Sequence, residues 1–273
     1  MSSLEYHPSY KITLPQSKKV GVLLSIPHSG IEFPSDIQNK YKSAMIKQPD
    51  DTDWYLQELY DFASEMGVTI IEAVYSRWVI DLNRTPENQN LYHDGRIITA
   101  LCPKTDFLGI PIYTNSENEP SNNEIQRRLK VYYTPYHEKI DHLLIDLKKE
   151  FGEVLFWDAH SIRRNVRTIQ EGDFPDLILG NNDETTASKK IIEIALNSLQ
   201  SGDFNVEHNH PFKGGHLTRS KGKPSNGIHA LQLEMSKDLY MQNKETVYDG
   251  EKAIKIKTIL KQTFTQLISC LHE

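Results

Sequence analysis

Two apolar segments of this sequence each run into a histidine, and this pattern limits the possible folds more than any other feature. Residues 20–26 are almost all apolar and lead into His28, and residues 154–157 lead into Asp158 and His160. A short apolar run of this kind is typical of a strand that is buried on both faces of a sheet. Ligands of open α/β sheets bind beyond the carboxyl ends of the strands, so we expect both histidines to face one crevice.

Strand-like and helix-like segments alternate along the rest of the chain, which predicts the α/β class. We find neither an internal repeat nor a low-complexity linker, so we expect residues 1–273 to form a single domain. The expected strands are residues 20–26, 68–75, 155–158, 177–179 and 228–233. The expected helices are residues 53–66, 129–147, 191–199 and 250–271, and Pro135 should kink or divide the second of them.

Composition excludes several classes of protein. The net charge is −6, and no block of basic residues suggests a surface for nucleic acid or for a membrane. No run approaches the roughly 18 apolar residues of a membrane span, and residues 1–10 lack the features of a signal peptide. Cys102 and Cys270 are too few for a disulfide framework, which fits a reducing compartment. We therefore expect a cytoplasmic protein.

Three carboxylates lie close together at the start of the first expected helix, at Asp50, Asp51 and Asp53. Capping of the helix by residue 51 or 52, together with the helix dipole, would explain one or two of them. A third leaves a carboxylate that could bind a metal ion. Two histidines and one carboxylate, with one coordination position left for water, are the protein ligands of one type of catalytic zinc site. The sequence therefore predicts a mononuclear zinc site that includes both histidines.

Two further segments carry side chains suited to amide hydrolysis. Asn83 and Arg84 are adjacent, and an amide beside a guanidinium can bind a substrate carboxylate, although Arg84 could instead pair with Asp81. Arg77 is available to stabilise an oxyanion. Glu234 ends an apolar strand, where a buried charge is costly unless it is paired or functional. A general base that activates water is a ready explanation for this glutamate.

Six short motifs occur in order and together resemble those of the N-formylglutamate amidohydrolase family. They read PHSG at 27–30, DTDW at 51–54, DLNR at 81–84, DAHS at 158–161, GGHLT at 214–218 and ALQLE at 230–234. Each motif alone is weak, whereas the ordered set is specific and extends from about residue 20 to residue 241. The family is related to zinc carboxypeptidases and to aspartoacylase. The resemblance therefore implies a mixed, twisted sheet flanked by helices, zinc carboxypeptidase-like, with one zinc ion at the strand ends.

The resemblance also implies which residues bind that zinc ion. It supports His28 and His160 as ligands. Zinc carboxypeptidase-like sites often take a glutamate three residues after the first histidine, but Ile31 stands there, so the carboxylate must come from elsewhere. Asp53 is our choice for this ligand, and Asp51 is the alternative. His216, in the fifth motif, receives no metal role.

The remaining roles implied by the resemblance concern the substrate. Arg77 would stabilise the oxyanion, and Glu234 would act as the general base. The two carboxylates of a glutamate substrate would need cationic or amide partners, and the candidates are Asn83, Arg84, Arg163, Arg164 and Arg219.

The activity implied by the resemblance is zinc-dependent hydrolysis of N-formyl-L-glutamate to formate and L-glutamate, which the family suggests belongs to histidine degradation. The substrate is a small dicarboxylate, and we expect no nucleic-acid or membrane partner. Two other functions stay open. One is a zinc deacylase or peptidase for another N-acyl amino acid. The other is a ligand-binding module without turnover, against which Glu234 argues, because simple binding gains little from a carboxylate aimed at a metal ion.

Overall fold

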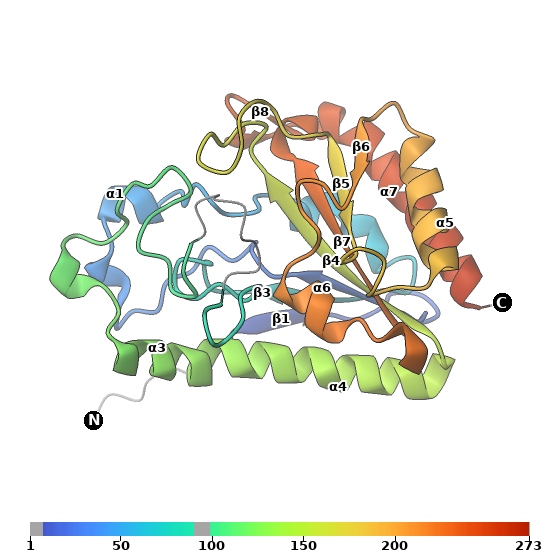
Figure 1. Ribbon diagram of the computed structural model, residues 1–273, viewed down its shortest axis with the longest axis horizontal. Helices are drawn as coiled ribbons and strands as arrows, with labels where there is room; N and C mark the ends of the chain where they lie inside the picture. Colours follow the sequence, from blue (N-terminus) through green and yellow to red (C-terminus); the bar gives the residue numbers. More distant parts are fainter. Residues whose placement is uncertain (1–7, 90–98, 273) are drawn as a thin grey trace.

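A seven-stranded sheet forms the centre of the molecule (Figure 1). The structure is a computed structural model, and it describes residues 8–89 and 99–272. The strands lie in the order β1, β3, β2, β4, β7, β5, β6. Their bounds are β1 Tyr10–Thr13, β2 Val22–Ile26, β3 Thr69–Ala73, β4 Val154–Ile162, β5 Leu177–Gly180, β6 Val206–His208 and β7 Ile228–Ser236. A separate hairpin pairs β8, Met241–Gln242, with β9, Val247–Tyr248.

The sheet is mixed, as predicted. Strands β3, β2, β4 and β7 are parallel to one another, while β1 is antiparallel to β3 and β5 is antiparallel to β7. Strand β6 is parallel to β5. Parallel strands are usually covered on both faces, because their crossover connections carry helices. All residues of β2, β4 and β5 are buried, which is the burial that their apolar runs predicted.

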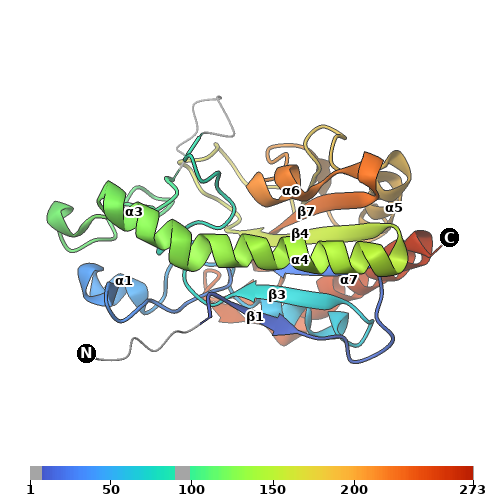
Figure 2. The same ribbon diagram turned by 90° about the horizontal axis from the view of Figure 1, so that it is seen from below.

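Helices cover both faces of the sheet (Figure 1, Figure 2). The α-helices are α1 Ser43–Ile46, α2 Leu56–Leu59, α3 Asn122–Arg128, α4 Thr134–Phe151, α5 Lys189–Gln200, α6 His216–Lys221 and α7 Gly250–Leu271. Phe156 of β4 belongs to the core under α4, whereas the neighbouring Trp157 belongs to the core under α5 and α7. Successive side chains of a strand point to opposite faces, so β4 contributes to both cores. Within the described part of the chain, no helix is long and apolar enough to cross a membrane.

Three of the four predicted helices are present. Helices α5 and α7 form where the apolar spacing predicted them. The long helix expected over residues 129–147 is α4, which is preceded by a π-helical turn, Leu129–Tyr133, and by α3. Pro135 follows the π-helical turn closely, and the right-handed helical backbone angles of Arg128, Leu129, Tyr133 and Thr134 show that the helical run continues from α3 into α4. The helix is therefore not divided at Pro135; it changes instead to π-helical hydrogen bonding just before this proline, over Leu129–Tyr133.

The predicted helix over residues 53–66 is wrong. A single turn of α-helix, α2, and a 3-10 turn, Asp61–Ala63, form there, and Tyr55 precedes α2 with a φ of 62°. Asp51 does not cap a helix, because its carboxylate accepts hydrogen bonds from Trp78 Nε1 at 2.8 Å and from the Phe107 amide at 3.0 Å. These distant partners outweigh the local preference for a capped helix.

Two strands are longer than predicted, and this changes how the site is built. Strand β4 continues to Ile162 and β7 to Ser236, because the two strands pair in register over nine residues each. His160 and Glu234 therefore lie within paired strands rather than in the loops that follow them. A strand holds its side chains more rigidly than a loop does, so both groups have fixed directions.

Gly30 lies in the loop that carries His28, and a Cβ at this position would stand 2.3 Å from the Tyr75 carbonyl oxygen. We expect Gly30→Ala to lower the free energy of unfolding by roughly 1–3 kcal/mol, the usual range for overpacking. Gly250→Ala is the control, since its Cβ would lie 4.0 Å from its nearest neighbour and alanine favours a helix. Urea denaturation measures both variants, and equal stabilities would contradict the close packing at Gly30.

Candidate active site

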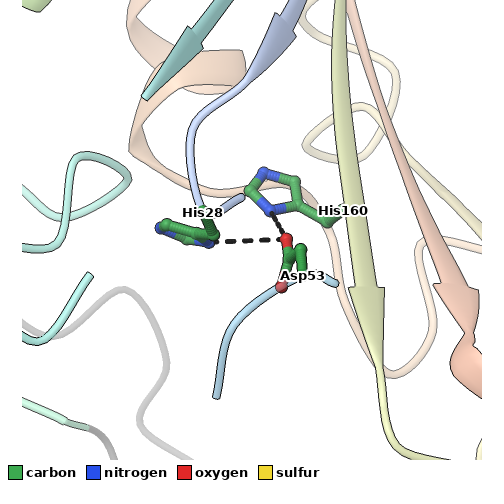
Figure 3. A group of neighbouring side chains, drawn as sticks. All are labelled: His28, Asp53 and His160. Carbon is green, nitrogen blue, oxygen red and sulfur yellow. Dashed lines mark hydrogen bonds and ion pairs between the residues drawn. The ribbon is translucent and has the colours of Figure 1, made fainter. Parts of the chain in front are cut away.

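Three buried side chains from separate segments meet beyond the end of β2 (Figure 3). His28 follows β2 by two residues, His160 lies in β4, and Asp53 comes from the turn before α2. The Asp53 amide donates to the His28 carbonyl oxygen at 2.9 Å, which ties this turn to the loop after β2. We refer to His28, Asp53 and His160 as the ligand cluster.

The donor atoms of the ligand cluster lie close enough to share one ion. Oδ2 of Asp53 is 3.1 Å from Nδ1 of His160 and 3.7 Å from Nδ1 of His28. The two imidazole rings are 4.8 Å apart between their centroids. None of the three residues is more than 3% exposed. Two imidazoles and a carboxylate form a donor set that suits Zn²⁺.

The two nitrogens of His28 have different surroundings. Nε2 lies 2.8 Å from Oδ1 of Asp81, so it carries the proton and donates to this carboxylate. Nδ1 then has a free lone pair; it is buried and makes no hydrogen bond with any described residue. Burial and the charge of Arg77 lower the pKa of His28, which favours the neutral imidazole. A histidine bound to a carboxylate through one nitrogen, with the other nitrogen free, is the usual arrangement of a metal ligand.

Asp81 accepts hydrogen bonds from three groups. Besides His28, Arg77 donates from Nη2 to Oδ2 at 2.6 Å, and the Asn83 amide donates to Oδ1 at 2.9 Å. Burial alone would raise the pKa of Asp81, but Arg77 and His28 outweigh it and hold the pKa well below its usual range. Asp81 is therefore an ionised carboxylate that orients His28.

His160 is held in place by Asp158 and Asn83. Its Nε2 lies 3.3 Å from Oδ2 of Asp158 and 3.0 Å from Nδ2 of Asn83. Thr218 donates to the same oxygen of Asp158 at 3.1 Å. Burial alone would lower the pKa of His160, but Asp158 and Asp53 outweigh it and raise the pKa well above its usual range. A metal ion that binds Nδ1 would therefore displace a proton from this imidazole.

Glu234 stands beside the ligand cluster on the next strand. It is the register partner of His160 in the ladder between β4 and β7, and its side chain is half-buried. Burial raises the pKa of Glu234 to about 8. A carboxyl group that titrates near neutral pH can both accept a proton and return it, which is what general acid–base catalysis requires.

Arg77 lies between Asp81 and an aromatic ring. Its guanidinium carbon is 4.7 Å from the ring centroid of Phe107, and only 8% of the residue is exposed. Burial alone would lower the pKa of Arg77, but the neighbouring aspartates, Asp81 first among them, raise it. The structure thus brings a permanent cation next to the ligand cluster, as an oxyanion-stabilising group would require.

Asn83 and Arg84 flank the Asp81 carboxylate. Arg84 donates from Nη2 to Thr99 Oγ1 at 3.3 Å, and its Nε lies 3.8 Å from Oδ2 of Asp81, so the pairing considered from the sequence is present at long range. Oδ1 of Asn83 accepts from the Leu217 amide at 2.7 Å, at the start of α6. This bond fixes the orientation of the amide and turns Nδ2 of Asn83 toward the ligand cluster.

The guanidinium groups of Arg163 and Arg164 are bound by carboxylates of the protein. The partners are Asp50 and Glu245 for Arg163, and Asp176 and Asp238 for Arg164. These ion pairs give both arginines a structural role, and the predicted binding of substrate by Arg163 gains no support from them. Arg219 donates from Nε to the Gly214 carbonyl oxygen at 2.8 Å, within the fifth motif.

Two carboxylates that position the histidines were not assigned that role from the sequence. Asp158 lies two residues before His160, and alternation along a strand would have placed both side chains on one face. Asp81 contacts His28 from 53 positions away, and no local signal predicts that contact. Asp158 belongs to the motif DAHS and Asp81 to the motif DLNR, so these motifs contain the carboxylate partners of His160 and His28 as well as His160 itself.

Residues 20–241 match the sequence profile of N-formylglutamate amidohydrolases. The chain belongs to this family. A protein of Pseudomonas putida named N-formylglutamate deformylase is 35% identical over 254 residues, which cover 92% of this chain and 93% of that protein. A protein of the same name from Pseudomonas aeruginosa is 35% identical over 257 residues, which cover 92% of this chain and 94% of that protein. This member of the N-formylglutamate amidohydrolase family is therefore a hydrolase that acts on an amide.

Solved structures confirm the predicted α/β fold. An N-formylglutamate amidohydrolase from Ralstonia eutropha JMP134 superposes with a TM-score of 0.77 over 97% of each chain, at 24% sequence identity. A protein from Agrobacterium tumefaciens superposes with a TM-score of 0.74 over 98% of each chain, at 17% identity. Both match the family member over nearly its whole length, which agrees with a single domain.

A pair of neighbouring variants tests which aspartate of this family member would bind a metal ion together with His28 and His160. Asp53→Asn removes the carboxylate of the ligand cluster, whereas the Asp51 oxygens contact Trp78 and Phe107. Loss of a group that only supports a ligand weakens binding about 10- to 100-fold, so Asp53→Asn should weaken zinc binding at least tenfold. Asp51→Asn should bind zinc as the parent does. Competition with a chelator measures both affinities, and the opposite ranking would transfer the role to Asp51.

Proposed function

We propose that this chain hydrolyses N-formyl-L-glutamate to formate and L-glutamate, and that the reaction depends on a zinc ion bound by His28, Asp53 and His160. The observation that carries the proposal is the buried ligand cluster with Glu234 as its neighbour on the next strand. The names of the two Pseudomonas relatives supply the substrate. The substrate would be a small molecule with two carboxylates, and we propose that the protein acts in the cytoplasm.

A zinc ion in the ligand cluster would supply Lewis acidity, which polarises a carbonyl group and makes water more acidic. Glu234 accepts a proton from the water that attacks the formyl carbon, and it later gives a proton to the nitrogen that leaves. The carbon–nitrogen bond breaks, the water oxygen stays in formate, and the nitrogen becomes the amine of glutamate. Arg77 donates hydrogen bonds to the carbonyl oxygen as negative charge develops there.

The carboxylates of the substrate would be bound on the side of Asn83 and Arg84. The guanidinium of Arg84 can bind a carboxylate through two parallel hydrogen bonds, which fixes both position and direction. The Arg84 side chain is 15% exposed, so a substrate reaches it while most of the side chain stays packed. This placement would bring the amide bond of the substrate close to the ligand cluster, because Nδ2 of Asn83 lies 3.0 Å from Nε2 of His160.

A substrate panel tests the proposed function against its nearest rival, a zinc deacylase or peptidase for another N-acyl amino acid. The panel contains the N-formyl, N-acetyl and N-succinyl derivatives of L-glutamate and L-aspartate. We expect kcat/KM to be highest for N-formyl-L-glutamate with the zinc-loaded protein. A higher value for another derivative would favour the rival. Binding without turnover of any derivative would favour a ligand-binding module.

Glu234→Gln tests the general base. Glutamine keeps the size of the side chain but cannot accept the proton, so kcat should fall by about 10²–10⁴. Zinc content should be unchanged, because Glu234 acts on water in this proposal and is not a zinc ligand. Glu207→Gln, which changes an exposed glutamate of β6, is the control and should keep the activity of the parent. Loss of zinc from Glu234→Gln would instead identify this residue as a ligand.

Arg84→Lys separates substrate binding from a structural role. Lysine keeps the charge and loses the two-pronged geometry, so KM should rise about 10-fold or more, since a hydrogen bond to a charged group contributes about 1.5–3 kcal/mol. Zinc content should not change. If Arg84 served only to pair with Asp81, the melting temperature would fall while KM stayed constant. Steady-state kinetics and a melting curve on one preparation distinguish these results, with the exposed Arg167→Lys as control.

A further inference from the structure

A small apolar cluster lies apart from the two larger cores of the protein. Its buried members are Ile162, Val166, Phe174 and Ile178, and Phe107, Ile169 and Phe212 pack against it. Ile162 closes β4, and Ile178 belongs to β5, so the cluster lies where these strands approach the candidate active site. We refer to Ile162, Val166, Phe174 and Ile178 as the small cluster.

The sheet register places the small cluster next to Glu234. Strand β7 is paired on one side with β4, where His160 is the partner of Glu234, and on the other side with β5, where the partner is Ile178. Residues that are directly opposite in neighbouring strands have adjacent side chains on one face of the sheet. Glu234 therefore has the ligand cluster on one side and the small cluster on the other.

Phe107 connects the small cluster with Arg77. Its ring packs against the small cluster, and the ring centroid is 4.7 Å from the Arg77 guanidinium carbon. The backbone of Phe107 is held on both sides, since its amide donates to Asp51 at 3.0 Å and its carbonyl oxygen accepts from Thr168 Oγ1. The ring therefore contacts Arg77, a proposed catalytic group. The small cluster, against which the ring packs, lies beside Glu234, another proposed catalytic group.

The contact between Arg77 and Phe107 places the ring near the proposed position of the substrate carbonyl group. Asp81 lies between two arginines, 3.8 Å from Arg84 and 2.6 Å from Arg77, and Phe107 lies against Arg77. A substrate with its carboxylate at Arg84 and its carbonyl oxygen at Arg77 would have its carbonyl carbon near the Phe107 ring, because the ring packs against the same guanidinium. In a formyl group the remaining substituent of the carbonyl carbon is a hydrogen atom, and in an acetyl group it is a methyl group.

We propose that Phe107, backed by the small cluster, forms a wall that limits the acyl group to a single carbon. The inference deepens the proposed function and rests on it, because it takes the positions of the substrate carboxylate and carbonyl from that proposal. Phe107 is on this view a specificity-determining residue. The difference of one methyl group in a hydrophobic pocket changes kcat/KM by about 10- to 200-fold, which sets the size of the expected effect.

The test compares Phe107→Ala with Leu108→Ala, its neighbour in the same loop. Leu108 is 50% exposed, so its truncation should leave the active site unchanged. For each variant, kcat/KM is measured with N-formyl-L-glutamate and with N-acetyl-L-glutamate, together with zinc content and melting temperature. We expect the ratio of acetyl to formyl activity to rise about 10-fold or more in Phe107→Ala and to stay constant in Leu108→Ala.

An unchanged ratio of acetyl to formyl activity in folded, zinc-loaded Phe107→Ala would contradict the proposal that Phe107 limits the acyl group. Phe107→Leu keeps an apolar side chain in the loop, so it serves if the alanine variant does not fold, and its ratio should shift in the same direction by a smaller factor. Failure of the proposed function gives a different result. In that case the parent protein would prefer an acyl group other than formyl, while Phe107→Ala would still shift its preference toward larger groups if the wall is present.

Discussion

The buried carboxylate of Asp81 is the group on which the candidate active site depends. It accepts hydrogen bonds from His28 Nε2, from Arg77 Nη2 and from the backbone N–H of Asn83. One side chain thereby orients a proposed zinc ligand, places a cation beside it and fixes the start of the segment that carries Arg84. Breaking a buried ion pair by removing one partner costs about 3–5 kcal/mol, because the other charge is left unpaired. Proposed metal binding, oxyanion stabilisation and substrate binding are therefore coupled through this carboxylate.

The pairing of β4 with β7 supplies the second half of the site. It sets His160 opposite Glu234 and Asp158 opposite Gln232, so four polar side chains share one face of the sheet. Gln232 in turn accepts from the Gly215 amide at 2.8 Å, which draws the start of α6 onto the strands. A side chain on a paired strand is held more precisely than one on a loop, and proton transfer depends on that precision. In the proposed mechanism, the length of β4 and β7 therefore matters for function as well as for structure.

The parts that were predicted from the sequence rest on local signals. Continuous apolar runs predicted the buried strands, and helical spacing predicted α5 and α7, because these patterns follow from the period of a single element. The predictions that were wrong concern segments whose structure depends on contacts with residues far away in the sequence. The segment 53–66 has helical spacing, but Asp51 binds Trp78 and Phe107 instead of capping a helix. The pairing of β4 with β7 likewise carries both strands beyond their predicted ends.

Asp51 and Asp53 are only two residues apart, but their side chains have different partners and different pKa shifts. Burial raises the pKa of Asp51 to about 6, although the charge of Arg77 and the hydrogen bonds from Trp78 and the Phe107 amide lower it. Burial would also raise the pKa of Asp53, but His160 and His28 outweigh it and lower the pKa. A metal ligand must be deprotonated, and the histidines of the ligand cluster favour that state in Asp53. Asp51, which is easier to protonate, instead anchors the backbone of Phe107.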